Sequence, residues 1–192
     1  MSKENGLSVI EMIFTILILT VIAVWSSSVF YNIQKEYGEK EELRKMQEKK
    51  NNIFRNFTIN IANNFENITI ENDKLKIHPT LNGCGNNENI AIYELNDNEL
   101  LCNNKVIYNN IENLNYSLGY DDNGNGNIDS YIFNNSKNNG ELKSITIELI
   151  LESQKKYYNE KEQTFHTLNG EKNIISNKFL EIYRQSIIKK AY

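Results

Sequence analysis

The fold is decided by residues 7–34, which read LSVIEMIFTILILTVIAVWSSSVFYNIQ. From Met12 to Gln34 this stretch contains no charged side chain. As a helix, Met12–Tyr31 alone extends about 30 Å at about 1.5 Å per residue, which matches the hydrocarbon thickness of a bilayer. Trp25 and the aromatic pair that ends at Tyr31 suit a membrane interface. The sequence therefore predicts a helix that spans a membrane once.

Glu11 is the exceptional residue of this stretch. A carboxylate inside an apolar helix is costly, by about 2.5–3.5 kcal/mol at the helix centre on insertion scales, unless a cation neutralises it. The most economical cation is an α-ammonium, created by cutting the chain between the polar residues 2–6 and the apolar block that begins at Leu7. A cleaved secretory signal, with Ser26–Ser28 as its cleavage site, and an uncut signal anchor are the alternatives. Neither alternative calls for Glu11.

A short polar leader that ends in Gly6, followed by an apolar run whose fifth residue is Glu11, resembles the class III signal of type IV pilins and of the pseudopilins of related machines. The resemblance implies that a prepilin peptidase cuts after Gly6 and methylates Leu7, the new first residue. It also implies that the Glu11 carboxylate pairs with the N-terminal ammonium of a neighbouring subunit. Pilins more often begin the mature chain with Phe, so Leu7 departs from the family pattern.

The expected orientation of the transmembrane helix conflicts with the positive-inside rule. Lys3 precedes the span, whereas six Lys or Arg side chains follow it by residue 50, and the positive-inside rule would place that side in the cytoplasm. The pilin-type signal dictates the opposite orientation, and five Glu side chains interleave those cations. We follow the signal and expect a leader at 1–6, a transmembrane and assembly half-helix at 7–34, and an exported head at 35–192. The protein is then a single-pass inner or cytoplasmic membrane protein until it enters a pilus or pseudopilus.

The helix is predicted to continue out of the membrane to about Asn64. No proline interrupts it, and Ile53, Phe57, Ile61 and Phe65 step by four and share one face. Beyond residue 65 the pattern changes to short apolar or alternating runs bounded by Asn, Asp and Gly, which predict antiparallel strands. We expect these strands at 68–70, 74–78, 90–95, 100–103, 105–108, 114–120, 130–133, 145–151 and 164–168.

The fold class expected from these elements is α+β. The strand at 145–151 places four apolar side chains on one face, which can cover the amphipathic half of the long helix: Ile145, Ile147, Leu149 and Leu151. A stripe of Ile175, Phe179, Ile182 and Ser186 predicts a short terminal helix over 173–190. A long N-terminal helix packed on an antiparallel sheet is also the pilin-like plan.

The order of the later elements carries a second resemblance. The runs Ile90–Leu95, Glu99–Leu101, Val106–Tyr116 and Lys143–Leu151 are similar to the minor pilins of the PilW kind and the J-type pseudopilins of type II secretion. That branch tends to stop soon after its last strands, whereas this chain continues. The resemblance implies a minor subunit and leaves open which machine it serves: a type IV pilus, a type II secretion system or a competence pseudopilus.

The chain has two cysteines, Cys84 and Cys102. In an exported head an even pair is expected to close into a disulfide, because the compartment is oxidising. A loop of about 18 residues would constrain the unfolded state by roughly 3 kcal/mol in the chain-entropy model. Zinc is the competing interpretation, but His78 and His166 lack the ligand spacing that it needs.

A calcium loop is a further hypothesis for residues 121–129. The segment matches the first nine positions of an EF-hand-type loop, with candidate ligands Asp121, Asn123, Asn125, Asn127 and Asp129 and a glycine at the sixth place. The twelfth position is Ile132, which has no carboxylate, so the predicted affinity for Ca²⁺ is weak. The alternative is a plain hairpin loop, in a chain that contains more than thirty asparagines.

Composition and motifs favour a structural role. The net charge of −4 disfavours binding of nucleic acid by bulk charge. No motif for a catalytic nucleophile, a phosphate loop or a catalytic zinc site is present, and we expect no enzyme and no specific small-molecule substrate. The expected partners are prepilin peptidase, other pilin or pseudopilin subunits and the membrane. The alternative is a membrane-anchored, pilus-associated binding module, an adhesin or DNA-capturing head, for which Tyr157 and Tyr158 beside Lys155 and Lys156 are the hint.

Overall fold

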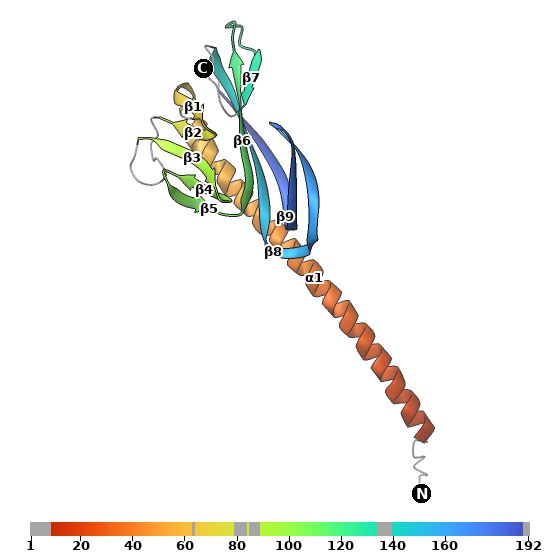
Figure 1. The fold of residues 1–192 in the computed structure, drawn as a ribbon. Coiled ribbons are helices and arrows are strands. Elements are labelled where there is room, and N and C mark those ends of the chain that lie inside the picture. Colours follow the sequence, from red (N-terminus) through yellow and green to blue (C-terminus); the bar gives the residue numbers. More distant parts are fainter. Residues whose placement is uncertain (1–8, 63, 79–83, 85–88, 134–139, 190–192) are drawn as a thin grey trace. The chain divides into compact units, whose positions relative to one another are not determined.

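The computed structural model describes residues 9–62, 64–78, 84, 89–133 and 140–189 of the 192. The chain divides into two compact units, Met1–Glu41 and Glu42–Tyr192, and we call the second unit the head. Helix α1 (Val9–Ala62) contributes residues to both units. A 3₁₀ turn, η1 (Phe65–Asn67), and nine described strands complete the head (Figure 1).

The part of α1 inside the head packs through the predicted face. Ile53, Phe57 and Ile61 are at most 1% exposed, and Met46 is buried further back along the helix. Residues spaced by four lie one above another on a helix, so these side chains form one apolar stripe. Ile59, which lies off this stripe, is 53% exposed. The predicted long helix and its core face are confirmed up to Ala62, whereas Phe65, predicted on the same helical face, is buried but lies in η1.

Five short strands form the first sheet. They are β1 (Ile68–Glu71), β2 (Lys74–Ile77), β3 (Ala91–Asn96), β4 (Glu99–Cys102) and β5 (Lys105–Tyr108), all antiparallel and in chain order across the sheet. Three of the hairpin turns are the pairs Asn72-Asp73, Asp97-Asn98 and Asn103-Asn104, and all six residues have positive φ. Asn and Asp tolerate this left-handed conformation better than other non-glycine residues, which is why they occupy these two-residue turns.

The second sheet has four antiparallel strands in the order β7-β6-β8-β9. Their bounds are β6 (Ile111–Asp121), β7 (Ser130–Phe133), β8 (Glu141–Thr167) and β9 (Gly170–Ile188). The four predicted core residues of β8, from Ile145 to Leu151 in steps of two, are fully buried. The predicted α+β architecture of a helix packed on antiparallel sheets is therefore confirmed.

One core joins the helix and both sheets within the head. The Phe57 ring from α1 lies 4.7 Å from the ring of Tyr93 on β3 and 6.3 Å from that of Tyr116 on β6, with the second pair edge to face. Phe57 is 1% exposed and Tyr116 is fully buried. Aromatic pairs in such geometries add about 0.5–1.5 kcal/mol beyond their burial. These rings fasten both sheets to the helix.

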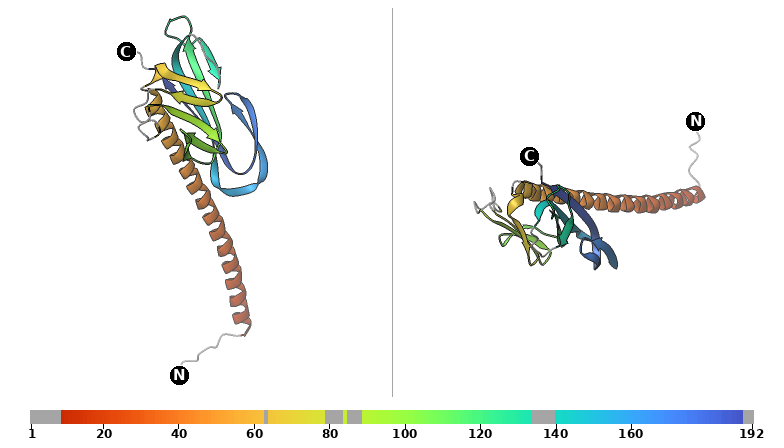
Figure 2. Two further views of the ribbon diagram at one scale, coloured as in Figure 1. Left: turned by 60° about the vertical axis from the view of Figure 1, so that its left-hand side comes forward. Right: turned by 90° about the horizontal axis from the view of Figure 1, so that it is seen from above.

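The β8–β9 hairpin is bent back on itself. Its pairing runs from Ser144 and Ile188 to Glu152 and Leu180, shifts register twice, and resumes from Lys161 to the turn at Thr167. We call residues 161–176 the flap. Phe165 and Ile174 of the flap pack on Ile150, Leu180 and Ile182, which form a second small core. Ile150 lies on the face of β8 opposite to the main core, so the flap covers the outer face of the sheet (Figures 1 and 2).

The predicted terminal helix over 173–190 is wrong, since the described residues up to Ile188 belong to β9. The helical stripe began at Ile175, which is 70% exposed, whereas its neighbour Ile174 is 6% exposed and Leu180 is 8% exposed. Burial therefore follows the alternation of a strand. Pairing with β8 along the segment satisfies its backbone groups, and the β-branched isoleucines suit a sheet. The strand predicted at 164–168 corresponds to the end of β8.

Substitutions at two isoleucines of α1, one buried and one exposed, test which face of the helix packs in the core. Replacing Ile61, which is fully buried, by alanine is expected to lower the free energy of unfolding by about 2–5 kcal/mol, because it removes buried methyl groups and leaves a cavity. The same change at the exposed Ile59 should cost no more than about 0.5 kcal/mol. Chemical denaturation of the full chain in detergent, followed by near-ultraviolet circular dichroism, measures both. Equal losses in I61A and I59A would contradict the packing described above.

Candidate functional site

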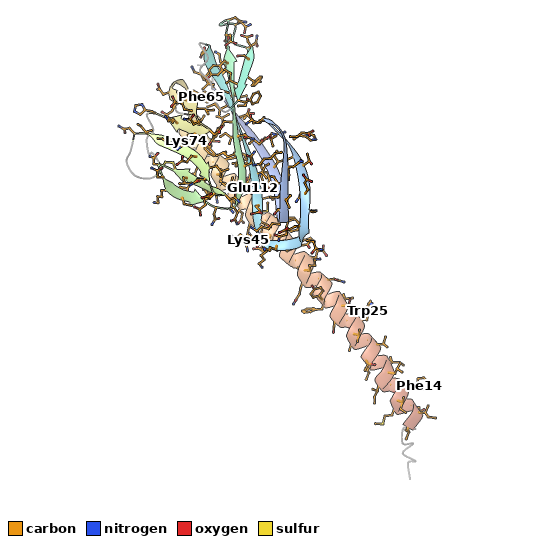
Figure 3. All side chains as sticks on the ribbon, in the orientation of Figure 1. Phe14, Trp25, Lys45, Phe65, Lys74 and Glu112 are labelled. Carbon is orange, nitrogen blue, oxygen red and sulfur yellow. A yellow bond between two sulfur atoms is a disulfide. The ribbon has the colours of Figure 1, made fainter. Side chains whose placement is uncertain are left out.

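The first candidate site is the apolar surface of α1. All side chains from Val9 to Tyr37 are exposed, and the large apolar ones up to Phe30 keep between 39% and 73% of their surface accessible. Figure 3 shows Phe14 and Trp25 projecting from the helix. The helix is long and apolar enough to cross a membrane, as a membrane anchor or a signal sequence does. An apolar surface of this size is unfavourable in water, which makes it a surface for lipid or for other apolar helices.

The hydroxyl groups of this segment are satisfied by the helix itself. Thr15 and Thr20 donate to the carbonyl oxygens of Glu11 and Leu17 at 2.7 Å, and Ser27 donates to that of Ala23 at 2.8 Å. A polar group without a hydrogen bond costs several kcal/mol in hydrocarbon. These internal bonds remove that cost for the hydroxyl protons, so the serine and threonine side chains are compatible with an apolar environment.

Glu11 lies near the start of α1, in its first turn. Its side chain is exposed between apolar neighbours. The N-terminal end of a helix carries partial positive charge, which favours a carboxylate there by about 0.3–1 kcal/mol. This local role is compatible with the predicted role in assembly. Gly6 and Leu7, the predicted processing residues, lie outside the described part of the chain, so the cleavage stays a prediction.

The predicted disulfide is present. Cys84 and Cys102 are bonded, with their Cα atoms 5.6 Å apart. Cys102 ends β4 and is 1% exposed, so the bond ties the segment before β3 to the main core. A disulfide is typical of a protein that folds in an oxidising compartment.

The loop between β6 and β7 is organised by Asp121. One carboxylate oxygen accepts the backbone N–H groups of Gly124 and Asn125 at 2.7 and 3.2 Å, and the other accepts that of Gly126 at 2.8 Å. Asp121 is 2% exposed. Desolvation raises the pKa of this carboxyl group, but the three N–H groups together with Lys143 outweigh it, so its pKa lies below the usual value. The carboxylate therefore stays ionised and holds the loop.

The other predicted calcium ligands make bonds of the same kind. Asn123 and Asn125 accept the backbone N–H groups two residues further on, at 3.0 and 2.7 Å, the second of which comes from Asn127. Asp129 accepts the N–H of Asp122 at 3.0 Å. The Lys143 ammonium lies 3.6 Å from Asp121, and a cation there competes with a divalent ion.

The loop thus has hydrogen bonds that stabilise it without an ion. Among the described residues, no group of three or more His, Cys, Asp or Glu side chains is placed to hold a metal. Calcium binding at residues 121–129 stays a prediction, and we derive no function from it.

Glu148 is the buried charge that sequence reasoning missed. It lies in β8 and is fully buried, although it interrupts an apolar run. Its carboxylate accepts hydrogen bonds from the Asn115 side-chain amide at 2.8 Å and from the backbone N–H of Leu168 at 3.0 and 3.1 Å. It also accepts a hydrogen bond from Nε of Arg184 at 2.6 Å. Removing one partner of a buried ion pair costs about 3–5 kcal/mol. These donors come from β6, β9 and the turn of the flap, so Glu148 fastens the flap to the sheet.

A second buried carboxylate fixes the bend below the flap. Glu42 of α1 is 2% exposed, accepts the backbone N–H of Gln154 at 3.2 Å and pairs with Lys45 at 3.2 Å. Lys178 pairs with Glu152 at 2.7 Å across the same bend. The place where β8 leaves the flat sheet is therefore tied to the helix and to β9.

Tyr157, one of the tyrosines predicted to mark a ligand surface, packs inside the head. Tyr157 is half-buried, and its ring lies 4.6 Å from that of Phe179 on β9. Lys155 and Lys156 beside it are exposed. Tyr157 therefore packs in the bend of the hairpin, while the side chain of Tyr158 lies outside the described part of the chain.

Comparisons of the chain with models of protein families, with curated proteins and with solved structures gave no match.

The attachment of the flap can be tested with two glutamates of one strand. Replacing Glu148 by glutamine keeps the size of the side chain but removes the charge opposite Arg184. We expect the opening free energy of residues 161–176 to fall by about 2 kcal/mol, which corresponds to about thirtyfold faster amide hydrogen exchange. Replacing Glu141, whose pairs with Lys143 and Lys189 are at the surface, should leave this exchange unchanged. Unaltered exchange in E148Q, or equal acceleration in β6, would contradict the attachment.

Proposed function

We propose that the chain is a structural minor pilin or pseudopilin. It is made as a precursor, cut after Gly6 by prepilin peptidase, held in the inner or cytoplasmic membrane by α1, and then packed into a filament through the same helix surface. The observation that supports this most strongly is the exposed apolar surface of α1 from Val9 to Ile33, with the acidic Glu11 near its start.

The apolar surface supports a route of two steps. Burying an exposed Val, Leu, Ile, Phe or Met side chain is worth about 1.5–3 kcal/mol each, so lipid is strongly preferred to water for this segment. Lipid chains and apolar helices are equally apolar, so moving this helix from one to the other changes its hydrophobic free energy little. Association between helices therefore depends on close packing and on polar contacts. The segment can therefore leave lipid for a bundle of like helices at little hydrophobic cost.

Glu11 supplies the polar contact in this scheme. A carboxylate in hydrocarbon costs about 2.5–3.5 kcal/mol on insertion scales, and residues 12–34 contain no cationic side chain at a similar depth. Cleavage before Leu7 would create an α-ammonium four residues from Glu11 in the sequence. Paired with the carboxylate of a neighbouring copy, this amine offsets the cost and sets the axial register between subunits.

The head supports export and a structural role. Its disulfide is suited to an oxidising space, and the second unit has a continuous core of its own. We assign no catalytic role to it. A binding head carried by the same filament is the alternative, and a polar cleft in the head is the observation that favours it.

The role of Glu11 is tested by assembly in cells that lack the native copy of the gene. Glu11→Gln and Glu11→Ala should reduce the amount recovered in sheared filaments by about tenfold or more, because a lost charge pair in hydrocarbon exceeds about 1.4 kcal/mol. The amount in the membrane should stay close to that of the parent chain. Glu36→Gln, which removes a surface pair with Lys40 outside the apolar segment, is the control and should assemble normally. Normal incorporation of both Glu11 variants would rule out the proposed pairing.

A further inference from the structure

The head contains a polar cleft of about 560 Å³ that the proposed role in a filament does not use. Its lining comes from the β1–β2 turn and the adjoining ends of β2 and β3, from β6, and from the flap. Clefts of this size are typical of sites for small ligands. The flap supplies one side of the cleft, so the attachment through Glu148 also shapes it.

The lining determines which ligand class fits. Asn72, Asn113 and Asn169 contribute side-chain amides, each of which both donates and accepts hydrogen bonds, and Asp73 and Glu171 contribute carboxylates. Among the described lining residues there are two leucines and no aromatic ring. A flat base or an apolar ligand would therefore find little to stack on. A ligand with many hydroxyl groups, which donate and accept on several sides, matches this surface.

The charges disfavour an anion. Three carboxylates and two ammonium groups line the cleft. Both ammonium groups are already engaged, because Lys74 pairs with Glu94, while Lys172 donates to the carbonyl oxygen of Glu112 at 3.2 Å and to Oδ1 of Asn113 at 3.1 Å. With three carboxylates against two ammonium groups, the lining carries a net negative charge, which disfavours a phosphate or sulfate.

The two sides of the cleft are held in place before any ligand arrives. Asn169 of the flap donates to Asn115 Oδ1 at 3.2 Å, and Asn115 in turn donates to Glu148. On the opposite side, Asn72 and Asp73 occupy a two-residue turn with φ of 52° and 59°. Such preorganisation lowers the entropy cost of binding.

We infer that this cleft binds a neutral, hydroxyl-rich ligand of the saccharide class between the β1–β2 turn and the flap. The Asn72 and Asp73 side chains hydrogen-bond its hydroxyl groups from one side, and Asn169 and Glu171 do so from the other. The inference does not depend on filament assembly, since a chain that never enters a filament still carries the cleft.

The test uses the full chain in lipid nanodiscs and ligand-observed saturation-transfer NMR with cellobiose, maltose and N,N′-diacetylchitobiose at millimolar concentration. We expect a signal from at least one of them that is absent with empty nanodiscs. Asn72→Gly combined with Asp73→Gly keeps the turn, because glycine accepts positive φ, and removes both side chains. Losing their hydrogen bonds should weaken binding by about tenfold.

The chain offers a matched control in the β3–β4 turn. Asp97→Gly combined with Asn98→Gly makes the same pair of changes at residues that have positive φ but do not line the cleft, and should leave binding intact. Three outcomes would overturn the inference: no signal from any of the three sugars, equal binding by the two double variants, or stronger binding of glucose 6-phosphate than of the neutral probes.

Discussion

The exposed apolar surface of α1 between Val9 and Ile33 limits where the N-terminal part of this protein can reside. In water its free-energy cost would be large, so it requires lipid or other apolar helices around it. A carboxylate near the start of such a helix adds a cost that a cation can offset, and residues 12–34 carry none. Together these features support the proposal that the chain first lies in a membrane and then packs against the apolar helices of like subunits.

In the head, the long β8–β9 hairpin folds back over the sheet, and only a small second core lies under the flap. β8 and β9 extend beyond the sheet and bend back, and two buried carboxylates fix the result: Glu42 at the bend and Glu148 under the flap. Burying a carboxylate is favourable only with several donors. At Glu148 these donors come from three separate parts of the chain, so one side chain determines where the flap lies and thereby shapes the polar cleft.

Periodicity sufficed to predict most of the elements. Steps of four from Ile53 identified the core face of the helix, and steps of two from Ile145 identified that of β8, because both patterns are local. The pattern after Asn173 predicts a helix where the structure has a strand, because its apolar residues fit either period and its β8 partner is distant in sequence for most of its length. The role of Glu148 depends on the bend of the hairpin, which no local pattern encodes. Ile150, two residues after Glu148 on the same face of β8, is the apolar residue that indicates that this outer face is covered.

The proposed cleavage after Gly6 can be observed directly at the amino terminus of the purified protein. Mass spectrometry of the protein purified from membranes or filaments should give a chain that begins at Leu7 and carries one methyl group on its amine. A chain that retains Met1, or one that begins near Val29 after a secretory cleavage, would contradict the account, because Glu11 would then have no amine at its depth or would have been removed.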